Sequence, residues 1–252
     1  MRSGMCISGK RCGCARIWPN KSTETVMELK NICIAVDGPA GAGKSSVSKA
    51  CAKAFGLVYI DTGAMYRSAA LYAIEQGIPI TEDALAPELD NIQIDMRYTD
   101  GVQRIYLNGK DVTARIREAD VSRGASDIAV IPAVRLKLVE LQRMLAKNNP
   151  VIMDGRDIGT YVLPDADLKI FLTASVDVRA RRRLAEMAQK GEAADFETVK
   201  RDIQYRDKND SEREFAPLRQ AVDAVLVDSS NMDFDGVVAH ISNLIQGKLG
   251  AE

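Results

Sequence analysis

The sequence predicts an α/β fold in which a five-stranded parallel sheet is flanked by helices and carries a small antiparallel insertion. Short apolar runs alternate with longer helical patterns from residue 31 onwards, as is typical of α/β proteins. A glycine-rich segment, residues 38–45, joins the first apolar run to the first helical pattern. Residues 92–109 instead show period-two patterning interrupted by Asp-Gly and Asn-Gly, which predicts antiparallel hairpins.

The composition fits one large folded domain. The chain has 252 residues, of which 46% are hydrophobic and 27% charged, as in ordinary globular proteins. Its formal net charge of −1 gives no electrostatic reason to expect nucleic acid as a partner. No apolar stretch approaches the roughly 20 residues that span a bilayer, and the basic N-terminal segment lacks the apolar core of a secretory signal. We therefore expect a cytoplasmic protein that binds neither nucleic acid nor membranes. We also expect a monomer, although none of these observations bears on the oligomeric state.

The first 30 residues differ from the rest of the chain. They carry six Lys and Arg residues against two Glu, and three of the five cysteines, namely Cys6, Cys12 and Cys14. A zinc site would need further ligands at suitable spacing, and the segment has no second cysteine pair or histidine. Because the segment also lacks hydrophobic periodicity, residues 1–30 are predicted to be a disordered extension. Residues 31–252 then form the folded domain.

The parallel strands are expected at the short apolar runs. The first run is continuous, as in a strand covered by helices on both faces of the sheet. The five runs are residues 32–36, 58–60, 151–153, 168–172 and 224–227. Because the carboxyl ends of parallel strands share one edge of the sheet, the residues that follow these runs are expected to line a ligand site.

Helical periodicity is clearest after the first strand and at the C-terminus. The first stripe consists of Val47, Ala50, Cys51 and Ala54, with Gly56 at the position of a C-terminal cap. The last consists of Phe234, Val237, Val238, Ile241, Leu244 and Ile245. A charged stretch from Val176 to about Asp210 is interrupted near Gly191, and we interpret it as a helical lid.

Residues 38–45 match the phosphate-binding loop pattern G-x-x-x-x-G-K-[ST], placed between a predicted strand and a predicted helix. Glycines let backbone N–H groups point inward around a phosphate, and the helix N-terminus adds free donors and a partial positive charge. Lys44 is expected to reach the β- and γ-phosphates, and the Ser45 hydroxyl to ligate Mg²⁺. The segment expected to hold ATP comprises Gly38, Pro39, Ala40, Gly41, Ala42, Gly43, Lys44, Ser45 and Ser46.

The residues around this loop favour a kinase over a switch or a mechanical ATPase. A guanine-specific switch would carry Asn-Lys-x-Asp, which the sequence lacks, and a mechanical ATPase usually has Asp-Glu at a strand end. Here Arg156 stands close behind the third apolar run instead. Phosphoryl transfer between two polyanions requires well-placed cations. The candidate cations are Arg67, Arg135, Arg156, Arg206 and Arg213.

Four segments together resemble the bacterial-type cytidylate kinases, and the resemblance extends from residue 31 to the C-terminus. The matching segments are residues 36–45, 61–67, 154–160 and 206–213. The resemblance implies a P-loop NTPase fold with sheet order 2-3-1-4-5. It also implies transfer of the ATP γ-phosphoryl group to CMP or dCMP with Mg²⁺. Residues 31–252 would be the kinase domain, with a CMP-binding insertion at about 88–125 and a lid at about 176–212.

The resemblance also implies which residues bind the acceptor. These are Thr62, Tyr66, Arg67, Ser126, Arg135, Arg156, Asp157, Arg206, Asp210 and Arg213. Arg67 would hold the acceptor phosphate and Asp210 would accept hydrogen bonds from the ribose, while the cytosine end would be contacted by Ser126, Asp157 and Arg206. The remaining arginines would complete the cationic acceptor site. The catalytic set is expected to be Lys44, Arg156, Asp157 and Arg213.

Alternatives remain at two points. The acceptor could be UMP, dTMP or shikimate instead of CMP, or the chain could be a regulator that binds ATP without an acceptor. The dense basic cluster, Arg179, Arg181, Arg182 and Arg183, fits two structural interpretations. It could close over ATP as part of the lid and exclude water, or form an exposed helix face with Arg182 paired to Glu186.

Overall fold

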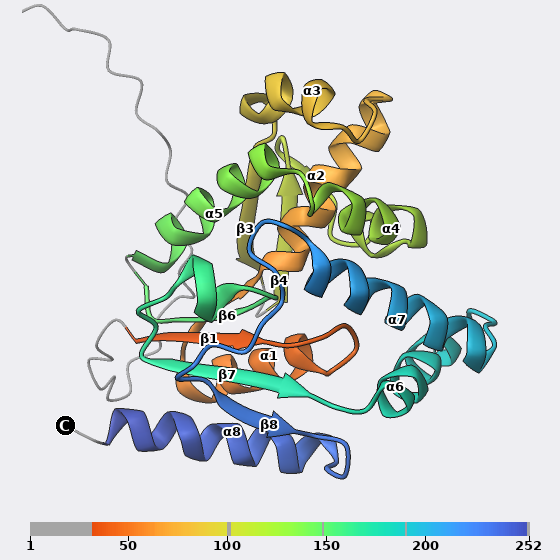
Figure 1. Cartoon of the computed structure of the whole chain (residues 1–252). Coiled ribbons are helices and arrows are strands. Elements are labelled where there is room, and N and C mark those ends of the chain that lie inside the picture. The colour runs from red at the N-terminus through yellow and green to blue at the C-terminus, as the bar shows by residue number, and fades with distance from the viewer. Residues whose placement is uncertain (1–31, 100–101, 148, 190, 251–252) are drawn as a thin grey trace, which may run out of the picture.

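The structure is a computed structural model that describes residues 32–99, 102–147, 149–189 and 191–250 (Figure 1). The extension predicted at residues 1–30 lies outside the described residues. Within the described ranges the chain forms one five-stranded sheet and one three-stranded sheet. Among the helices in these ranges, none combines the length and the apolar character needed to cross a bilayer.

The larger sheet is parallel throughout and has the order β2-β6-β1-β7-β8. Its strands are β1 (Cys33–Asp37), β2 (Val58–Asp61), β6 (Val151–Asp154), β7 (Leu168–Thr173) and β8 (Val225–Asp228). Numbered along the chain within this sheet, the order is 2-3-1-4-5, so the expected topology is confirmed. Asp154 lies opposite both Val36 and Asp61 in the register. The carboxyl ends of three strands therefore finish at the same level.

Helices cover both faces of this sheet (Figure 1). On one face, α1 (Lys44–Phe55) and α8 (Phe234–Leu249) share a buried cluster with Ile34 and Val36 of β1. On the other face, a second cluster contains residues of three helices, α2 (Thr62–Gln76), α4 (Ala119–Ile128) and α5 (Pro132–Lys147). The shorter elements are α3 (Glu82–Leu85), η1 (Ala86–Asn91), η2 (Arg115–Arg117) and the π-helical turn η3 (Ile158–Val162).

Both predicted apolar stripes lie on helices, but one residue of each stripe is exposed instead of buried. In α1, Val47 and Cys51 are buried but Ala54 is exposed, because the buried arc turns towards Ala52 in the last turn. Gly56 caps this helix as expected, with φ of 66° and its N–H bonded to the carbonyl of Ala52. In α8, Phe234 is the first helical residue and remains 51% exposed.

The antiparallel insertion forms a second sheet in the order β3-β4-β5. Its strands are β3 (Ile94–Thr99), β4 (Val102–Leu107) and β5 (Lys110–Asp111). Asn108 and Gly109 turn the chain with φ of 49° and 81°, as a tight hairpin turn requires. Met96 and Ile105 are buried in the same cluster as α2, so this sheet is fixed to the helix that begins at the end of β2.

The charged stretch forms a pair of helices, α6 (Val176–Gln189) and α7 (Phe196–Glu212), which extend from one side of the domain (Figure 1). Gly191 follows α6 with φ of 76°, which a glycine adopts readily. The two helices share a small buried cluster of Ala180, Val199 and Ile203. These two helices therefore pack on each other, and α7 returns across the edge where the strands end.

Candidate active site

The phosphate-binding loop occupies the turn between β1 and α1. Gly38 has φ of 146°, and a Cβ there would lie 1.9 Å from the carbonyl oxygen of Leu172, so no other residue fits. Gly43 precedes α1 with φ of 92° and forms no side-chain cap. The first N–H groups of α1 are therefore left available for an anion.

Lys44 folds back onto this loop. Its Nζ donates to the carbonyl oxygens of Gly38 at 2.7 Å and Pro39 at 2.8 Å, and the residue is only 5% exposed. Burial, followed by the nearby Arg156 charge, lowers the pKa of Lys44 to about 7. A polyphosphate beside Nζ would favour its charged form, so binding of such a ligand is expected to raise the pKa of Lys44 and protonate it.

Asp154 lies at the end of β6 and contacts the residue that follows Lys44. It accepts from Ser45 Oγ at 2.8 Å and from the Tyr59 hydroxyl at 2.7 Å. Burial raises the pKa of this carboxyl. The sequence indicated the motif that begins here but not Asp154 itself as a site residue. Its position as the last residue of a buried strand beside the loop was the available signal.

Ser45 and Asp154 fit a magnesium site. Mg²⁺ prefers oxygen ligands and usually takes only one or two from protein, completing its shell with water and substrate phosphates. The Ser45 hydroxyl and the Asp154 carboxylate, 2.8 Å apart beside the phosphate-binding loop, could supply these two protein ligands. Within the described residues no group of three His, Cys, Asp or Glu could hold a metal.

Asp37 is a second carboxylate that sequence reasoning missed. Its two oxygens accept from the backbone N–H groups of Ile158 at 2.8 Å and Gly159 at 2.7 Å. Burial raises its pKa to about 6, against the lowering effect of these two bonds. The contact fixes η3 to the end of β1, and so holds the segment that carries Arg156 and Asp157.

A buried ion-pair network lies on this segment. Arg135 of α5 is fully buried and pairs with Asp157 at 2.5 Å, while Arg213 pairs with the other oxygen of Asp157 at 3.0 Å. The Arg135 guanidinium also lies 5.6 Å from the ring centroids of Tyr66 and Phe215. Burial raises the pKa of Tyr66 to about 12. Four of the expected acceptor residues therefore meet in one cluster.

Helix α7 brings further expected residues to the same edge. Arg156 Nε donates to Asp210 of α7 at 2.7 Å. Arg206, one turn earlier on α7, donates to the carbonyl oxygen of Ser122 at 3.4 Å. Ser126 is half-buried one turn further along α4. The structure therefore brings α4, α7 and the end of β6 together around the expected acceptor position.

Thr62 and Arg67 join the site from the start of α2. Thr62 Oγ1 donates to the carbonyl oxygen of Asp154 at 2.7 Å. Arg67 pairs with Asp61 at 3.1 Å. Among the described residues, the buried Nε atoms of Arg67 and Arg135 have no hydrogen-bond partner. Buried donors of this kind are normally satisfied, so both are available to donate to a ligand oxygen.

The members of the basic cluster on α6 differ in their contacts. Arg179 is buried and donates to the carbonyl oxygen of Ala40 in the loop at 2.9 Å and to Asp207 at 2.5 Å. Arg182 donates to the carbonyl oxygen of Ser229 at 2.8 Å, so the pairing with Glu186 expected from spacing is wrong. Glu186 instead pairs with Arg183 at 3.3 Å.

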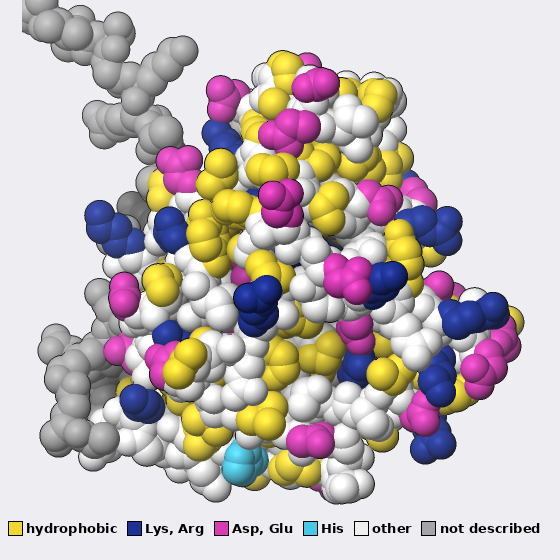
Figure 2. Space-filling view, in the orientation of Figure 1, with side chains coloured by type: hydrophobic (Ala, Val, Ile, Leu, Met, Phe, Trp, Pro, Cys, Tyr) yellow, Lys and Arg dark blue, Asp and Glu magenta, His cyan; other side chains and the backbone are white. Residues whose placement is uncertain are grey.

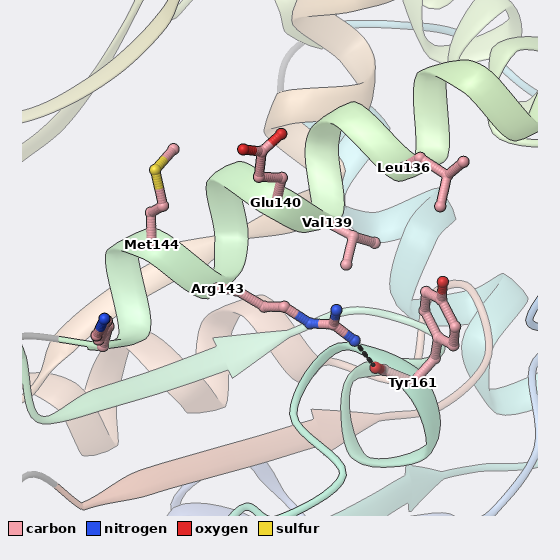
Figure 3. Close-up of a pocket in the computed structure, with 7 residues that line it drawn as sticks. Leu136, Val139, Glu140, Arg143, Met144 and Tyr161 are labelled. Carbon is pink, nitrogen blue, oxygen red and sulfur yellow. Dashed lines mark hydrogen bonds between the residues drawn. The ribbon is translucent and has the colours of Figure 1, made fainter.

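A surface hollow of about 270 Å³ lies elsewhere, along α5 (Figure 3). Leu136, Met144 and Tyr161 are among its lining residues, and Arg143 donates from Nη2 to the carbonyl oxygen of Tyr161 at 2.7 Å. None of its lining residues belongs to the loop or to the arginine network. On the face shown in Figure 2, basic side chains are scattered among acidic ones and do not gather into one patch.

The fold and the site define a P-loop kinase: a phosphate-binding loop faces a set of arginines across the carboxyl edge of a parallel sheet. The cytidylate kinase family matches residues 34–247 of this chain. The chain belongs to the cytidylate kinase family.

Individual relatives agree with this assignment. A cytidylate kinase of Caldicellulosiruptor saccharolyticus is 48% identical over 225 residues, covering 89% of this chain and 100% of the relative. One of Leuconostoc mesenteroides is 49% identical, covering 88% and 99%. One of an Exiguobacterium species is also 49% identical, covering 86% and 97%. In each case the match spans nearly the whole relative.

Proposed function

We propose that this protein transfers the γ-phosphoryl group of ATP to CMP or dCMP, giving ADP and CDP or dCDP. The observation that carries the proposal is the arginine network that faces the phosphate-binding loop. Arg156 lies close enough to Lys44 to lower its pKa, and Arg135 and Arg67 each hold a buried Nε without a partner. A site of this charge suits a second phosphate-bearing substrate beside ATP.

The donor side is assigned to the loop. Residues 38–46 would hold the ATP phosphates through backbone N–H groups, and Lys44 would leave the loop carbonyls to contact the β- and γ-phosphates. Ser45 and Asp154 would hold Mg²⁺, which neutralises charge on the ATP phosphates. Asp154 therefore joins Ser45 in the proposed metal site.

The acceptor side is assigned to α2, α5, α7 and the end of β6. Arg67 would bind the acceptor phosphate, supported by Arg156 and Arg213. Asp210 would receive the ribose hydroxyls. The other proposed acceptor contacts are Thr62, Tyr66, Ser126, Arg135, Asp157 and Arg206. The ranges 88–125 and 176–212 would act as the CMP-binding insertion and the lid.

The proposed reaction is a direct in-line transfer. A phosphate oxygen of CMP attacks the γ-phosphorus, and the bond to the β–γ bridging oxygen breaks so that ADP leaves. Lys44, Arg156 and Arg213 would stabilise the charge that spreads over the transferring group. The acceptor arrives as a phosphate anion, so no enzyme base is required and no covalent enzyme intermediate forms.

One panel of assays tests the proposal. ADP release is measured with ATP alone and with ATP plus CMP, dCMP, UMP, dTMP, AMP or shikimate. We expect turnover with CMP and dCMP well above every other acceptor. Stronger turnover with UMP, dTMP or shikimate would assign a different acceptor. ADP release that no acceptor increases would favour a nucleotide-binding regulator. Light scattering on the same sample tests the expected monomer.

A further inference from the structure

Arg117 has no role in the assignments above, yet it contacts the start of the acceptor site. It lies in η2, which follows the antiparallel sheet within the proposed CMP-binding insertion (88–125), and its Nη2 donates to Asp61 Oδ2 at 2.8 Å. Arg67 donates to the same carboxylate oxygen at 3.1 Å. One buried carboxylate at the end of β2 is thus shared by an expected substrate-binding arginine and by an arginine from the insertion.

Asp61 is held as an anion in a buried position. It is 2% exposed, and its Oδ1 accepts from the backbone N–H of Ala64, which caps α2. Burial alone would raise its pKa, but Arg67 and Arg117 together lower it to about 2. A buried carboxylate without a counter-charge is strongly unfavourable, so Asp61 needs at least one of the two arginines.

Arg67 retains an unused hydrogen-bond donor beside this carboxylate. Its Nε is buried without a partner. Its Nη1 would lie 3.1 Å from a Cβ placed at Gly63, so the guanidinium packs against the backbone of this glycine. If Arg67 turns its guanidinium towards a phosphate, its Nη2 pairing with Asp61 weakens. Arg117 would then be the remaining counter-charge for that carboxylate.

We propose that Arg117 is a positioning residue that neutralises Asp61, so that Arg67 can turn to the acceptor phosphate. The inference rests on the proposed function, because it takes Arg67 as the acceptor-phosphate ligand. A simpler role for Arg117 would be to tether the insertion to β2 through the same ion pair. The two roles predict opposite effects when the charge of Asp61 is removed.

The test measures CMP binding without ATP, by calorimetry, in the full chain. Arg117→Gln is expected to raise the Kd for CMP by roughly ten- to hundredfold, as loss of a hydrogen-bonded charge does, and to leave the Kd for ATP within about twofold. Asp61→Asn keeps an oxygen for the Ala64 N–H but frees Arg67. It is therefore expected to leave the Kd for CMP unchanged or lower, and Arg117→Gln should have no further effect in the Asp61→Asn background.

The outcomes separate the alternatives. If Asp61→Asn weakens CMP binding as Arg117→Gln does, Arg117 is a tether and the inference is overturned; unchanged CMP binding by Arg117→Gln also overturns it. Should Arg117→Gln fail to fold, Asp61→Asn alone still decides. Arg115→Gln is the matched control, because Arg115 lies on the same η2 and pairs only with the exposed Asp120 and Glu118 among the described contacts.

A further variant distinguishes failure of the inference from failure of the proposed function. Arg67→Ala is expected to lose most CMP binding whatever the role of Arg117. If Arg67→Ala binds CMP like the unaltered protein, the acceptor-site assignment itself is wrong. If the unaltered protein binds no CMP, the proposed function fails before Arg117 is considered.

Discussion

Ser45 Oγ and Asp154 Oδ2 lie 2.8 Å apart, although 109 positions separate them in the chain. The contact joins the first turn of α1 to the last residue of β6. Tyr59 of β2 bonds the other oxygen of Asp154 at 2.7 Å. Three neighbouring elements therefore converge on a carboxylate beside the loop hydroxyl, the pair proposed to hold Mg²⁺.

The first prediction concerns this carboxylate. Asp154→Asn keeps the shape but removes the charge that would attract Mg²⁺, so the Mg²⁺ concentration for half-maximal activity should rise roughly tenfold or more. Tyr59→Phe is the matched control, since it removes one bond to Asp154 and leaves the carboxylate charge. An unchanged Mg²⁺ titration in Asp154→Asn would exclude Asp154 from the metal site.

The second prediction concerns proton uptake by Lys44. Its pKa is lowered to about 7 by burial and by Arg156, so at pH 8.5 the amine of the free protein is mainly neutral. Phosphates beside Nζ favour the ammonium form and raise the pKa. ATP binding at pH 8.5 should therefore take up nearly one proton, and this uptake should vanish below about pH 6, where Lys44 is already charged.

Calorimetry in buffers of different ionisation enthalpy measures this uptake. Lys44→Met should abolish it and should lower kcat on the order of 100-fold or more, as loss of one electrostatic stabiliser does. Lys53→Met, on the exposed side of the same helix, should leave both unchanged. Proton uptake that survives in Lys44→Met would assign it to another group.

The third prediction concerns recognition of the acceptor by α7. Arg206→Ala should reduce kcat/KM for CMP by roughly ten- to hundredfold while ATP binding stays within about twofold, because a charged hydrogen-bond donor is lost on the acceptor side only. Arg201→Ala is the control, since Arg201 is exposed and bonds only within the first turns of α7 in the described contacts. Wild-type kcat/KM for CMP in Arg206→Ala would remove α7 from the acceptor site.

The fourth prediction concerns stability of the buried network. Asp157→Ala leaves Arg135, which is fully buried, without its counter-charge. Breaking a buried pair in this way typically costs about 3–5 kcal/mol. Asp95→Ala removes an exposed pair with Arg97 and should cost about 1 kcal/mol or less. Urea unfolding of both variants measures the difference; equal losses would contradict a structural role for the Arg135–Asp157 pair.

The fifth prediction concerns the pH profile of turnover. A phosphate monoester has its second pKa at about 6, so the acid limb of kcat/KM should follow the acceptor and shift downward with a CMP analogue of lower pKa. His240, the sole histidine of the chain, is exposed on α8, and His240→Gln should leave the limb unchanged. A limb that stays fixed across acceptors would indicate a titrating enzyme base.

The sequence alone determined the elements with strong local signals. The parallel strands, the glycine cap of α1 and the antiparallel hairpins follow from hydrophobic period and turn chemistry. The phosphate-binding loop follows from glycine spacing between a strand and a helix. The sheet order came from the resemblance to a known family, because local periodicity does not specify which strands are neighbours.

Only the tertiary structure decided how side chains pair. Spacing along a helix suggested that Arg182 meets Glu186, yet Arg182 reaches Ser229, because burial against another element outweighs a weak exposed pair. Asp37 and Asp154 follow apolar runs whose ends were expected to line a ligand site, but their individual roles depend on partners more than 100 positions away. Contacts between distant segments depend on the packing of whole elements, which local sequence patterns do not encode.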